Sequence, residues 1–358
     1  MDLITRSTAP SAADRLQVVE LESDDRRWLR LVEELTAASP FHHPTWQAAL
    51  GDAYGLQCRI LGLQTEGDLV AGVPFVRVRR LRRRVTVSLP FTDHCPPLAR
   101  SDRDLAQLLQ EALAGAWRDQ AVELRSSIPP TSGLVTRQVA VRPVLELEQD
   151  PPSLWRRLRK DHKRSVQQAR RLGVRVRFGQ AESDLVVLRR LQLATRRRLG
   201  VPMQPAILFA AIQRHVLDQG RGFVAIAESP GGDPIAAGLF LHHGEIVVHK
   251  YSASLADAWG LRPNHLLVWS ALAWACEHGY RSFDFGRTDL EAEGLRLFKA
   301  GWGARELPLE YTWTAGATPA TGRGAASGRV LQGLGVLIRH SPPLVCQMLG
   351  QVLYRHAA

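Results

Sequence analysis

The sequence predicts an α/β protein, of the α+β type with mixed sheets, built from two copies of one unit. Similar segments recur in the same order in both halves, at an offset of about 160 residues. GDLVAG at 67–72 matches GDPIAAG at 232–238, and ALAGAW at 112–117 matches ALAWAC at 271–276. A chain of 358 residues is also long for one hydrophobic core and suits two domains.

The first copy is predicted over residues 15–150. Its strands are runs of β-branched and apolar residues bounded by glycine and aspartate, which favour turns. An alanine- and leucine-rich helix follows them and leads into a short apolar strand. The predicted strands are 57–63, 69–79, 84–89 and 122–124, and the predicted helix is 103–118.

The second copy is predicted over residues 151–313. A PGGD turn at 230–233 separates its first two strands, and a turn at His243 and Gly244 precedes the third. Pro263 suits the first turn of a helix, and Gly279 suits its end. The predicted strands are 222–228, 234–242, 245–252, 282–285 and 307–313, and the predicted main helix is 263–278.

Composition indicates a soluble globular protein with an anionic partner. Hydrophobic residues make up 45% and charged residues 23%, but the formal charge is +11. That charge favours nucleic acid, a phosphate-bearing substrate or an acidic membrane surface as the partner. The four cysteines lie far apart without a CxxC pair, which predicts reduced thiols of a cytoplasmic protein and no metal site. We also see neither a secretory signal near the N-terminus nor an apolar run long enough to span a membrane.

A basic helix is predicted over residues 155–177, at the start of the second copy. This stretch holds ten Lys or Arg residues and one acid, Asp161. Like charges on a helix repel, and no acids alternate here to relieve them. We therefore favour an anionic partner over a merely solvated face. The residues expected to bind donor phosphates or nucleic acid are Arg156, Arg159, Lys160, Lys163 and Arg164.

The C-terminal region divides into a linker and a tail. Residues 314–327 are rich in Ala, Gly and Thr, which predicts a linker. Residues 328–358 include apolar positions at helical spacing, such as Leu344, Met348 and Val352. This amphipathic tail either docks on the body of the protein or touches the inner surface of the membrane.

The candidate active site follows the strand at 282–285. Its polar end carries Asp284, Arg287 and Asp289, and a brief helix then delivers Lys299 beside Trp302. Only four of the 46 Lys and Arg residues are lysines, so each remaining lysine is a candidate for a role that needs a compact ammonium. The alternatives are a solvated Lys299, a structural hydrogen bond for Asp284 and helix N-capping by Asp289.

Several motifs together resemble the Fem-type aminoacyltransferases and their acetyltransferase-6 relatives, over residues 15–313. The most specific are FDFG at 283–286 and the FKAGWG segment at 298–303. Others are FHHPTW at 41–46, Pro90-Phe91 with PPL at 96–98, RRLG at 170–173 and LRPNHLL at 261–267. The resemblance implies two tandem GNAT-like domains. It also implies acyl transfer to an amine, from aminoacyl-tRNA to a peptidoglycan precursor or related envelope acceptor.

The resemblance implies roles for individual residues. Lys299 is expected near the transferred acyl group, where it would stabilise an oxyanion or the donor phosphates. Tyr251, beside Lys250, is expected to meet the nucleotide-sugar precursor. On chemical grounds, Asp284 or Asp289 would orient or deprotonate the amine, and Arg287 would hold a phosphate or carboxylate of the acceptor. Trp302 is a further expected substrate contact. No tightly bound cofactor is expected.

One departure bears on the donor. A GNAT site for CoA normally has a glycine-rich turn whose N–H groups hold the pyrophosphate. The matching stretch at 258–265 has only Gly260 and places Pro263 where an N–H would be useful. This favours aminoacyl-tRNA. The alternatives are an acyl-CoA-dependent N-acyltransferase acting on exopolysaccharide or lipid intermediates, a nucleic-acid-binding module without catalysis, and a membrane-associated scaffold.

Overall fold

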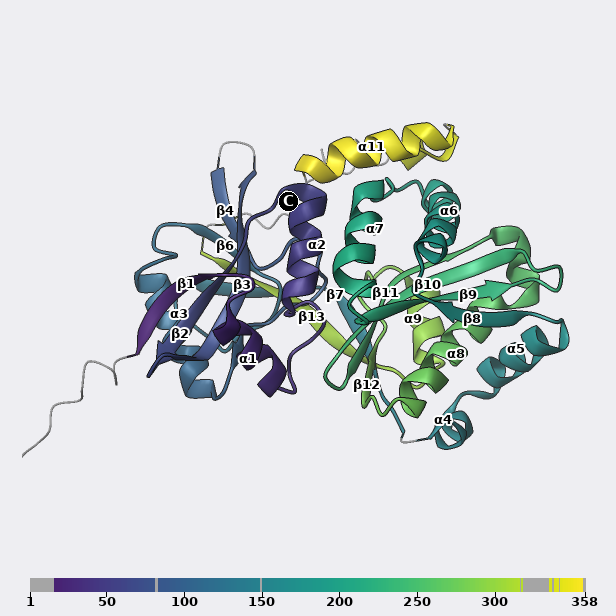
Figure 1. Ribbon diagram of the computed structural model, residues 1–358, viewed down its shortest axis with the longest axis horizontal. Helices are drawn as coiled ribbons and strands as arrows, with labels where there is room; N and C mark the ends of the chain where they lie inside the picture. Colours follow the sequence, from purple (N-terminus) through teal and green to yellow (C-terminus); the bar gives the residue numbers. More distant parts are fainter. Residues whose placement is uncertain are drawn as a thin grey trace, which may run out of the picture.

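A 13-stranded mixed sheet organises the computed structural model, which describes residues 16–80, 83–148, 150–315, 317, 335, 336, 338–340 and 342–356. Its strands run in the order β1-β2-β3-β4-β6-β13-β7-β12-β11-β10-β9-β8, with β5 paired to β3 (Figure 1). The elements of the first half are β1 (Gln17–Glu22), α1 (Arg26–Glu34), α2 (Pro44–Tyr54), β2 (Cys58–Thr65), β3 (Asp68–Arg80), β4 (Arg83–Val87), β5 (Leu98–Ala99), α3 (Asp102–Ala114), β6 (Ala121–Leu124) and β7 (Leu134–Glu146).

The second half repeats this order, which confirms the predicted duplication. Its elements are α4 (Pro151–Arg157), α5 (Lys160–Arg171), β8 (Arg175–Gly179), α6 (Glu182–Leu199), α7 (Ala206–Ile212), β9 (Gly222–Glu228), β10 (Pro234–His243), β11 (Ile246–Ser254), α8 (Pro263–Glu277), β12 (Ser282–Asp284), α9 (Glu293–Ala300) and β13 (Arg305–Thr314). In each half an antiparallel meander ends in one parallel pair, β4 with β6 and β11 with β12.

The two halves exchange their last strands. β7 pairs with β12 of the second half, and β13 pairs with β6 of the first half as well as with β7. These strands lie at the centre of the molecule, and the meanders extend to either side (Figure 1). The result is one continuous sheet rather than two separate ones. We propose that the boundary between the two domains lies between residues 150 and 151, where α4 begins.

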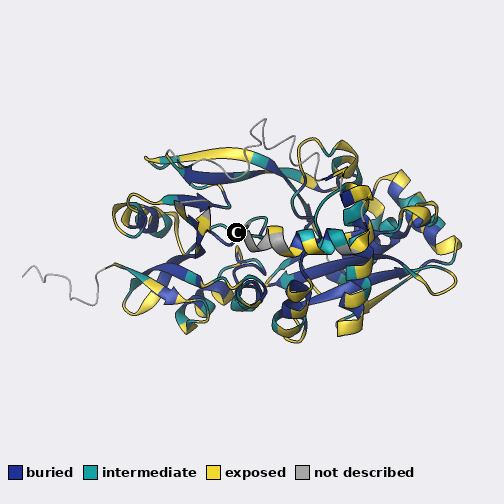
Figure 2. Cartoon of the chain, turned by 90° about the horizontal axis from the view of Figure 1, so that it is seen from above, coloured by how far each residue is buried: buried dark blue, intermediate teal, exposed yellow. Residues whose placement is uncertain are grey.

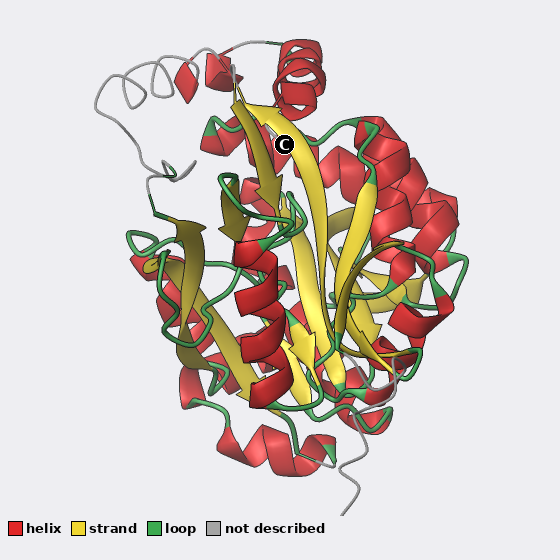
Figure 3. Cartoon of the chain, turned by 90° about the vertical axis from the view of Figure 1, so that its left-hand side faces the viewer, coloured by secondary structure: helices red, strands yellow, loops and turns green. Residues whose placement is uncertain are grey.

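Helices cover both faces of the sheet (Figure 3). On one face α2, α6 and α7 share a core with residues of β3, β10 and β11. On the other face α3 packs on the first half, while α5 and α8 pack on the second. The strands between them are mostly buried, whereas the helices expose their outward sides (Figure 2). The continuous apolar runs of strands such as β9 and β10 reflect this two-sided burial.

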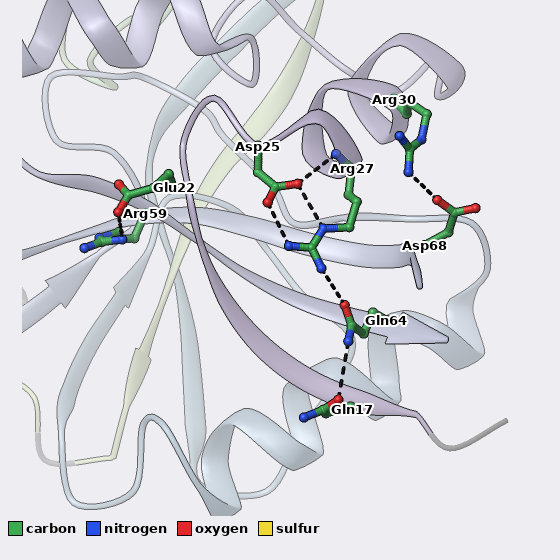
Figure 4. Close-up of polar contacts among 8 residues, drawn as sticks. All are labelled: Gln17, Glu22, Asp25, Arg27, Arg30, Arg59, Gln64 and Asp68. Carbon is green, nitrogen blue, oxygen red and sulfur yellow. Dashed lines mark hydrogen bonds and ion pairs between the residues drawn. The ribbon is translucent and has the colours of Figure 1, made fainter. Parts of the chain in front are cut away.

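The outer edge of the first half is held by polar contacts around β1 and α1 (Figure 4). Asp25 caps α1 by accepting from the N–H of Arg27, and its carboxylate also pairs with the Arg27 guanidinium at 2.7 Å. Arg27 donates in turn to Gln64 on β2 at 2.9 Å. These contacts fix α1 across the edge of the sheet, far from the FDFG segment.

The predicted basic helix over 155–177 is wrong in its extent. The chain forms two helices, because Leu158 and Arg159 adopt extended backbone angles between α4 and α5. Residues 175–179 then form β8, which pairs with β9 at the sheet edge. The alternation of Arg175, Arg177 and Gly179 with apolar Val176 and Phe178 suits such an edge strand, and the charge run concealed it.

The tail forms α11 (Pro343–His356), which lies over α6. Cys346 and Ile338 are fully buried, and a Cβ on Gly350 would clash with the carbonyl oxygen of Met203. Docking on the body of the protein is thus observed for this helix, although Met348 and Leu353 remain exposed. Most of the predicted linker at 314–327 lies outside the described residues. Every described helix is too short or too polar to cross a bilayer.

Helix α9 is fixed by a close contact with α5. A Cβ on Gly301 would overlap the His162 ring, so only glycine fits there, whereas a Cβ on Gly294 would meet nothing. We expect Gly301→Ala to lower the free energy of unfolding by about 1–3 kcal/mol. The control Gly294→Ala, in the first turn of α9, should be neutral or stabilising by up to about 1 kcal/mol. Urea denaturation measures both, and equal stability of the two variants would refute this packing.

Candidate functional site

The candidate site begins where β11 and β12 separate. The two strands pair in parallel from Ile246 with Ser282 to Val248 with Asp284. β12 ends there, while β11 continues to Ser254. Gly286 follows in the left-handed region, with φ +69°, and a Cβ on it would lie 3.2 Å from the His249 carbonyl oxygen. Glycine therefore lets the chain turn away sharply beside β11 and opens the sheet at this point.

Lys299 lies at this opening and is only 6% exposed. Its Nζ donates to the carbonyl oxygens of Phe285 at 2.6 Å and Gly286 at 3.2 Å. It also contacts Oγ1 of Thr288 at 2.7 Å. Burial lowers the pKa of the ammonium to about 8, although Asp284 and Asp93 oppose that shift. The alternative of a solvated lysine is therefore wrong.

Asp284 is buried beside Lys299, and both of its carboxylate oxygens are engaged. One accepts from Arg142 at 2.8 Å, and the other accepts from the N–H of Gly286 at 2.7 Å. Arg142 comes from β7, so the strand exchange supplies the partner of Asp284. The structural hydrogen bond considered for Asp284 is present, and it shapes the loop around Lys299.

A loop from the first half closes the opposite side of the opening. Leu89 and Phe91 both have positive φ angles, 46° and 61°, which are uncommon for such residues. The turn presents its carbonyl and carboxylate groups to Lys250 on β11. Lys250 donates to the Phe91 carbonyl at 3.0 Å and pairs with Asp93 at 3.2 Å. The ammonium also lies 5.1 Å from the ring centre of Phe41.

Tyr311 on β13 links this loop to the segment after β12. Its hydroxyl donates to the Asp93 carbonyl at 3.0 Å. Burial raises the pKa of the phenol, and the nearby charges of Arg125 and Arg287 oppose that shift. Arg125 also donates to the carbonyl of Thr92 at 2.8 Å. Cationic side chains from both halves, Arg125 and Lys250, thus contact this loop.

The other predicted site residues lie in different surroundings, from exposed to fully buried. Arg287 pairs with Asp289 at 2.9 Å, and Asp289 is largely exposed. Asp289 does not cap α9, whose N-cap is Ala292. Tyr251 is half-buried near Phe209 and Lys250. Trp302 is 1% exposed in the core between α5 and α9, a position that does not suit the predicted substrate contact.

Some of the predicted phosphate-binding residues already contact other groups of the protein, and others do not form an ion pair. Arg159 pairs with Asp161, and Lys163 donates to the Arg156 carbonyl at the end of α4. Arg156 contacts Ser153. In the described part of the chain, Lys160 and Arg164 form no ion pair. These two residues lie one turn apart on α5 and are the most available of the five for an anion.

Sequence reasoning missed the contributions of Asp93, Arg142 and Tyr311. Asp93 lies between two of the motifs that resemble the Fem-type family, Pro90-Phe91 and the PPL segment at 96–98. No local signal places it beside Lys250, which is distant in sequence. Arg142 and Tyr311 reach the site only because β7 and β13 exchange places. The one sequence signal available was a polar residue within an apolar strand, as with Arg142 in β7.

The segment that takes the place of the glycine-rich CoA turn is wound tightly. Residues Ala256–Leu261 form a 3₁₀ helix, and Arg262 then starts α8 with φ 57°. The N–H groups of Ala258, Arg262 and His265 donate to carbonyls three residues earlier in the chain. They are therefore committed and do not form an open cradle for a pyrophosphate. Among the described residues no cluster of side chains suits a metal ion.

Comparison with known families supports the sequence motifs. Residues 156–300 match the family described as an acetyltransferase (GNAT) domain. An 84-residue stretch is 33% identical to a lipid II:glycine glycyltransferase of Staphylococcus haemolyticus (strain JCSC1435), and 82 residues are 32% identical to the same-named protein of Staphylococcus aureus. These stretches make up 22% and 21% of this chain, and each spans about a fifth of the relative's length.

Solved structures share the whole fold. A crystal structure of FemX superposes with a TM-score of 0.67 at 14% identity and covers 89% of this chain and all of its own. The structure of L-PGS from Bacillus licheniformis gives a TM-score of 0.56 at 15% identity, covering 90% of this chain and 99% of its own. The predicted resemblance to the Fem-type family is therefore confirmed: residues 156–300 are similar to the acetyltransferase (GNAT) domain, and the chain shares its overall fold with FemX.

Proposed function

We propose that this protein transfers an aminoacyl group from charged tRNA to an amine of a phosphate-bearing cell-envelope precursor. The observation that carries the proposal is the buried ammonium of Lys299 where β11 and β12 part. In an open α/β sheet, ligands bind outside the carboxyl ends of strands. The likeness to lipid II:glycine glycyltransferases supports the acceptor class.

The reaction needs no nucleophile from the protein. The amine of the acceptor attacks the ester carbonyl carbon, the C–N bond forms, and the C–O bond to the carrier ribose breaks. The amine proton passes to the departing ribose oxygen. The charge of Lys299 would stabilise the oxyanion that forms between these steps, because a buried charge acts strongly at short range. Nζ would leave its hydrogen bond to Oγ1 of Thr288 to reach the oxyanion.

The other cationic side chains suit the acceptor. Lys250 and Arg287 lie on the side of the opening formed with the first-half loop, each with one carboxylate partner. A phosphate entering there would compete with Asp93 and Asp289 for these cations. Asp284 would position the loop rather than remove a proton, because both its oxygens are already engaged.

Contact of the exposed side of α11 with the inner membrane surface is part of the same proposal.

Acyl-CoA remains the second candidate donor, because the matched family is an acetyltransferase domain. Purified protein should be incubated separately with charged tRNA and with acyl-CoA, together with muropeptide precursors, and the products read by mass spectrometry. Transfer from tRNA supports the proposal. Transfer from acyl-CoA alone would replace it with the second candidate, and transfer from neither would reject both.

Replacing Lys299 tests its charge. We expect Lys299→Met to lower kcat about a hundredfold or more, because an oxyanion donor contributes roughly that factor. The ammonium is present below its pKa of about 8 and is lost above it. The ratio of wild-type to variant rates should therefore fall as the pH rises through about 8, and the ratio cancels titration of the acceptor amine. A folded variant with unchanged kcat would contradict the role.

Replacing Lys160 and Arg164 tests the basic helix. The double variant Lys160→Gln/Arg164→Gln should bind tRNA more weakly, and its log Kd should depend less steeply on log salt, by about one unit for each phosphate that is no longer bound. A matched control, Arg30→Gln/Arg100→Gln, removes two charges on the first half, where both are paired with acids. Filter binding at several salt concentrations measures this. Equal salt dependence in both variants would exclude α5 from the binding surface.

A further inference from the structure

One aromatic side chain stands out on the surface of the second half. Trp259, in the 3₁₀ helix at Ala256–Leu261, is 45% exposed. Its ring is nevertheless held in one orientation, because Nε1 donates to Oγ of Ser254 at 3.0 Å. The guanidinium of Arg198 lies 4.5 Å from the ring centre, over one face. Indoles usually bury most of their area, so an exposed and oriented ring is suited to binding.

Trp259 lies at the end of the strand that forms the site. Ser254, which holds the indole, is the last residue of β11 and also accepts from Asn264 on α8. Ser254 lies six positions after Val248, the last residue to pair with β12, and an extended strand of six residue steps spans about 20 Å. The indole is therefore well separated from the opening but lies along the same strand.

A chain of contacts joins this surface to Lys299. The N–H of Arg262 donates to the Trp259 carbonyl, and Arg262 begins α8. His265 on α8 lies 5.1 Å from the ring of His162 on α5. His162 in turn donates to the carbonyl of Phe298, the residue before Lys299. The indole is thus linked to Lys299 through α8, α5 and the end of α9.

Cationic side chains lie along this chain of contacts. Arg198 and Arg262 are both exposed, and neither forms an ion pair within the described ranges. Lys160 is a further cation at the start of α5, two residues before His162. It forms no ion pair among the described residues. Asp257 is the exposed acid on the same 3₁₀ helix. An oriented aromatic face with arginines beside it is the combination that binds a base together with its phosphate.

We propose that Trp259 and Arg198 form a stacking platform for a nucleobase of the acyl carrier. The inference rests on the proposed function, in which the acyl group arrives on a nucleotide carrier. The single-stranded 3′ end of tRNA and the adenine of CoA share this chemistry, since every base offers a π face. The platform recognises the carrier away from the acyl group, so it sets KM rather than kcat.

The test uses the full chain with two probes, a single-stranded oligonucleotide ending in CCA and CoA. Trp259→Ala should raise the Kd of the carrier probe about ten- to hundredfold, since stacking on one base contributes that much. Trp259→Phe should restore most of the affinity, because it keeps an aromatic face. Arg198→Ala should weaken binding as well. Val186→Ala, an exposed position on the same helix as Arg198, is the control and should change nothing.

The outcomes separate the carriers and the two proposals. A loss confined to the oligonucleotide assigns the platform to tRNA, and a loss confined to CoA assigns it to CoA. Unchanged Kd values for both probes in Trp259→Ala, or no binding of either probe by the wild type, overturns the platform. Lys299→Met should still bind the probe. Trp259-dependent binding without any transfer activity would reject the proposed function and leave the platform in place.

Discussion

The buried ammonium of Lys299 determines the shape of the candidate site. A charge in the interior is costly unless it is hydrogen-bonded, and burial has already lowered its pKa to about 8. The segment after β12 meets this need by turning two carbonyl groups and the Thr288 hydroxyl toward Nζ. Gly286 allows the turn, and Asp284 holds its N–H. Removing the lysine would leave buried carbonyls without a donor.

The strand exchange brings the remaining side chains to this point. Neither half contains the whole cluster, because Arg142 arrives on β7 and Tyr311 on β13, while Asp93 belongs to a loop of the first half. Such pairing also makes the sheet continuous, so the two halves cannot separate without breaking β7 and β13 from their neighbours. The site is therefore rigidly placed at the junction, as preorganised electrostatic stabilisation requires.

Helix α9 connects this site to the basic helix. One side of α9 presents Lys299 to the opening, and the other side packs Gly301 and Trp302 against His162 of α5. The two glycines that flank Trp302 are required for different physical reasons. Gly301 leaves room for the imidazole, while Gly303 has a φ of +88°. An anion bound on α5 would thus rest on the same packed unit that holds the lysine.

The sequence by itself determined the duplicated order of elements and the bounds of β9, β10 and α8 to within a residue. It also singled out Lys299 and Asp284 as candidate site residues, which the structure brings together at the end of β12. Those features follow from local periodicity, turn residues and the scarcity of lysine. Only the tertiary structure decided that Lys250 faces Asp93, that Trp302 is buried and that the basic run forms α4, α5 and β8. Each of these depends on partners distant in sequence. Strand exchange and close packing select those partners, and no local pattern records them.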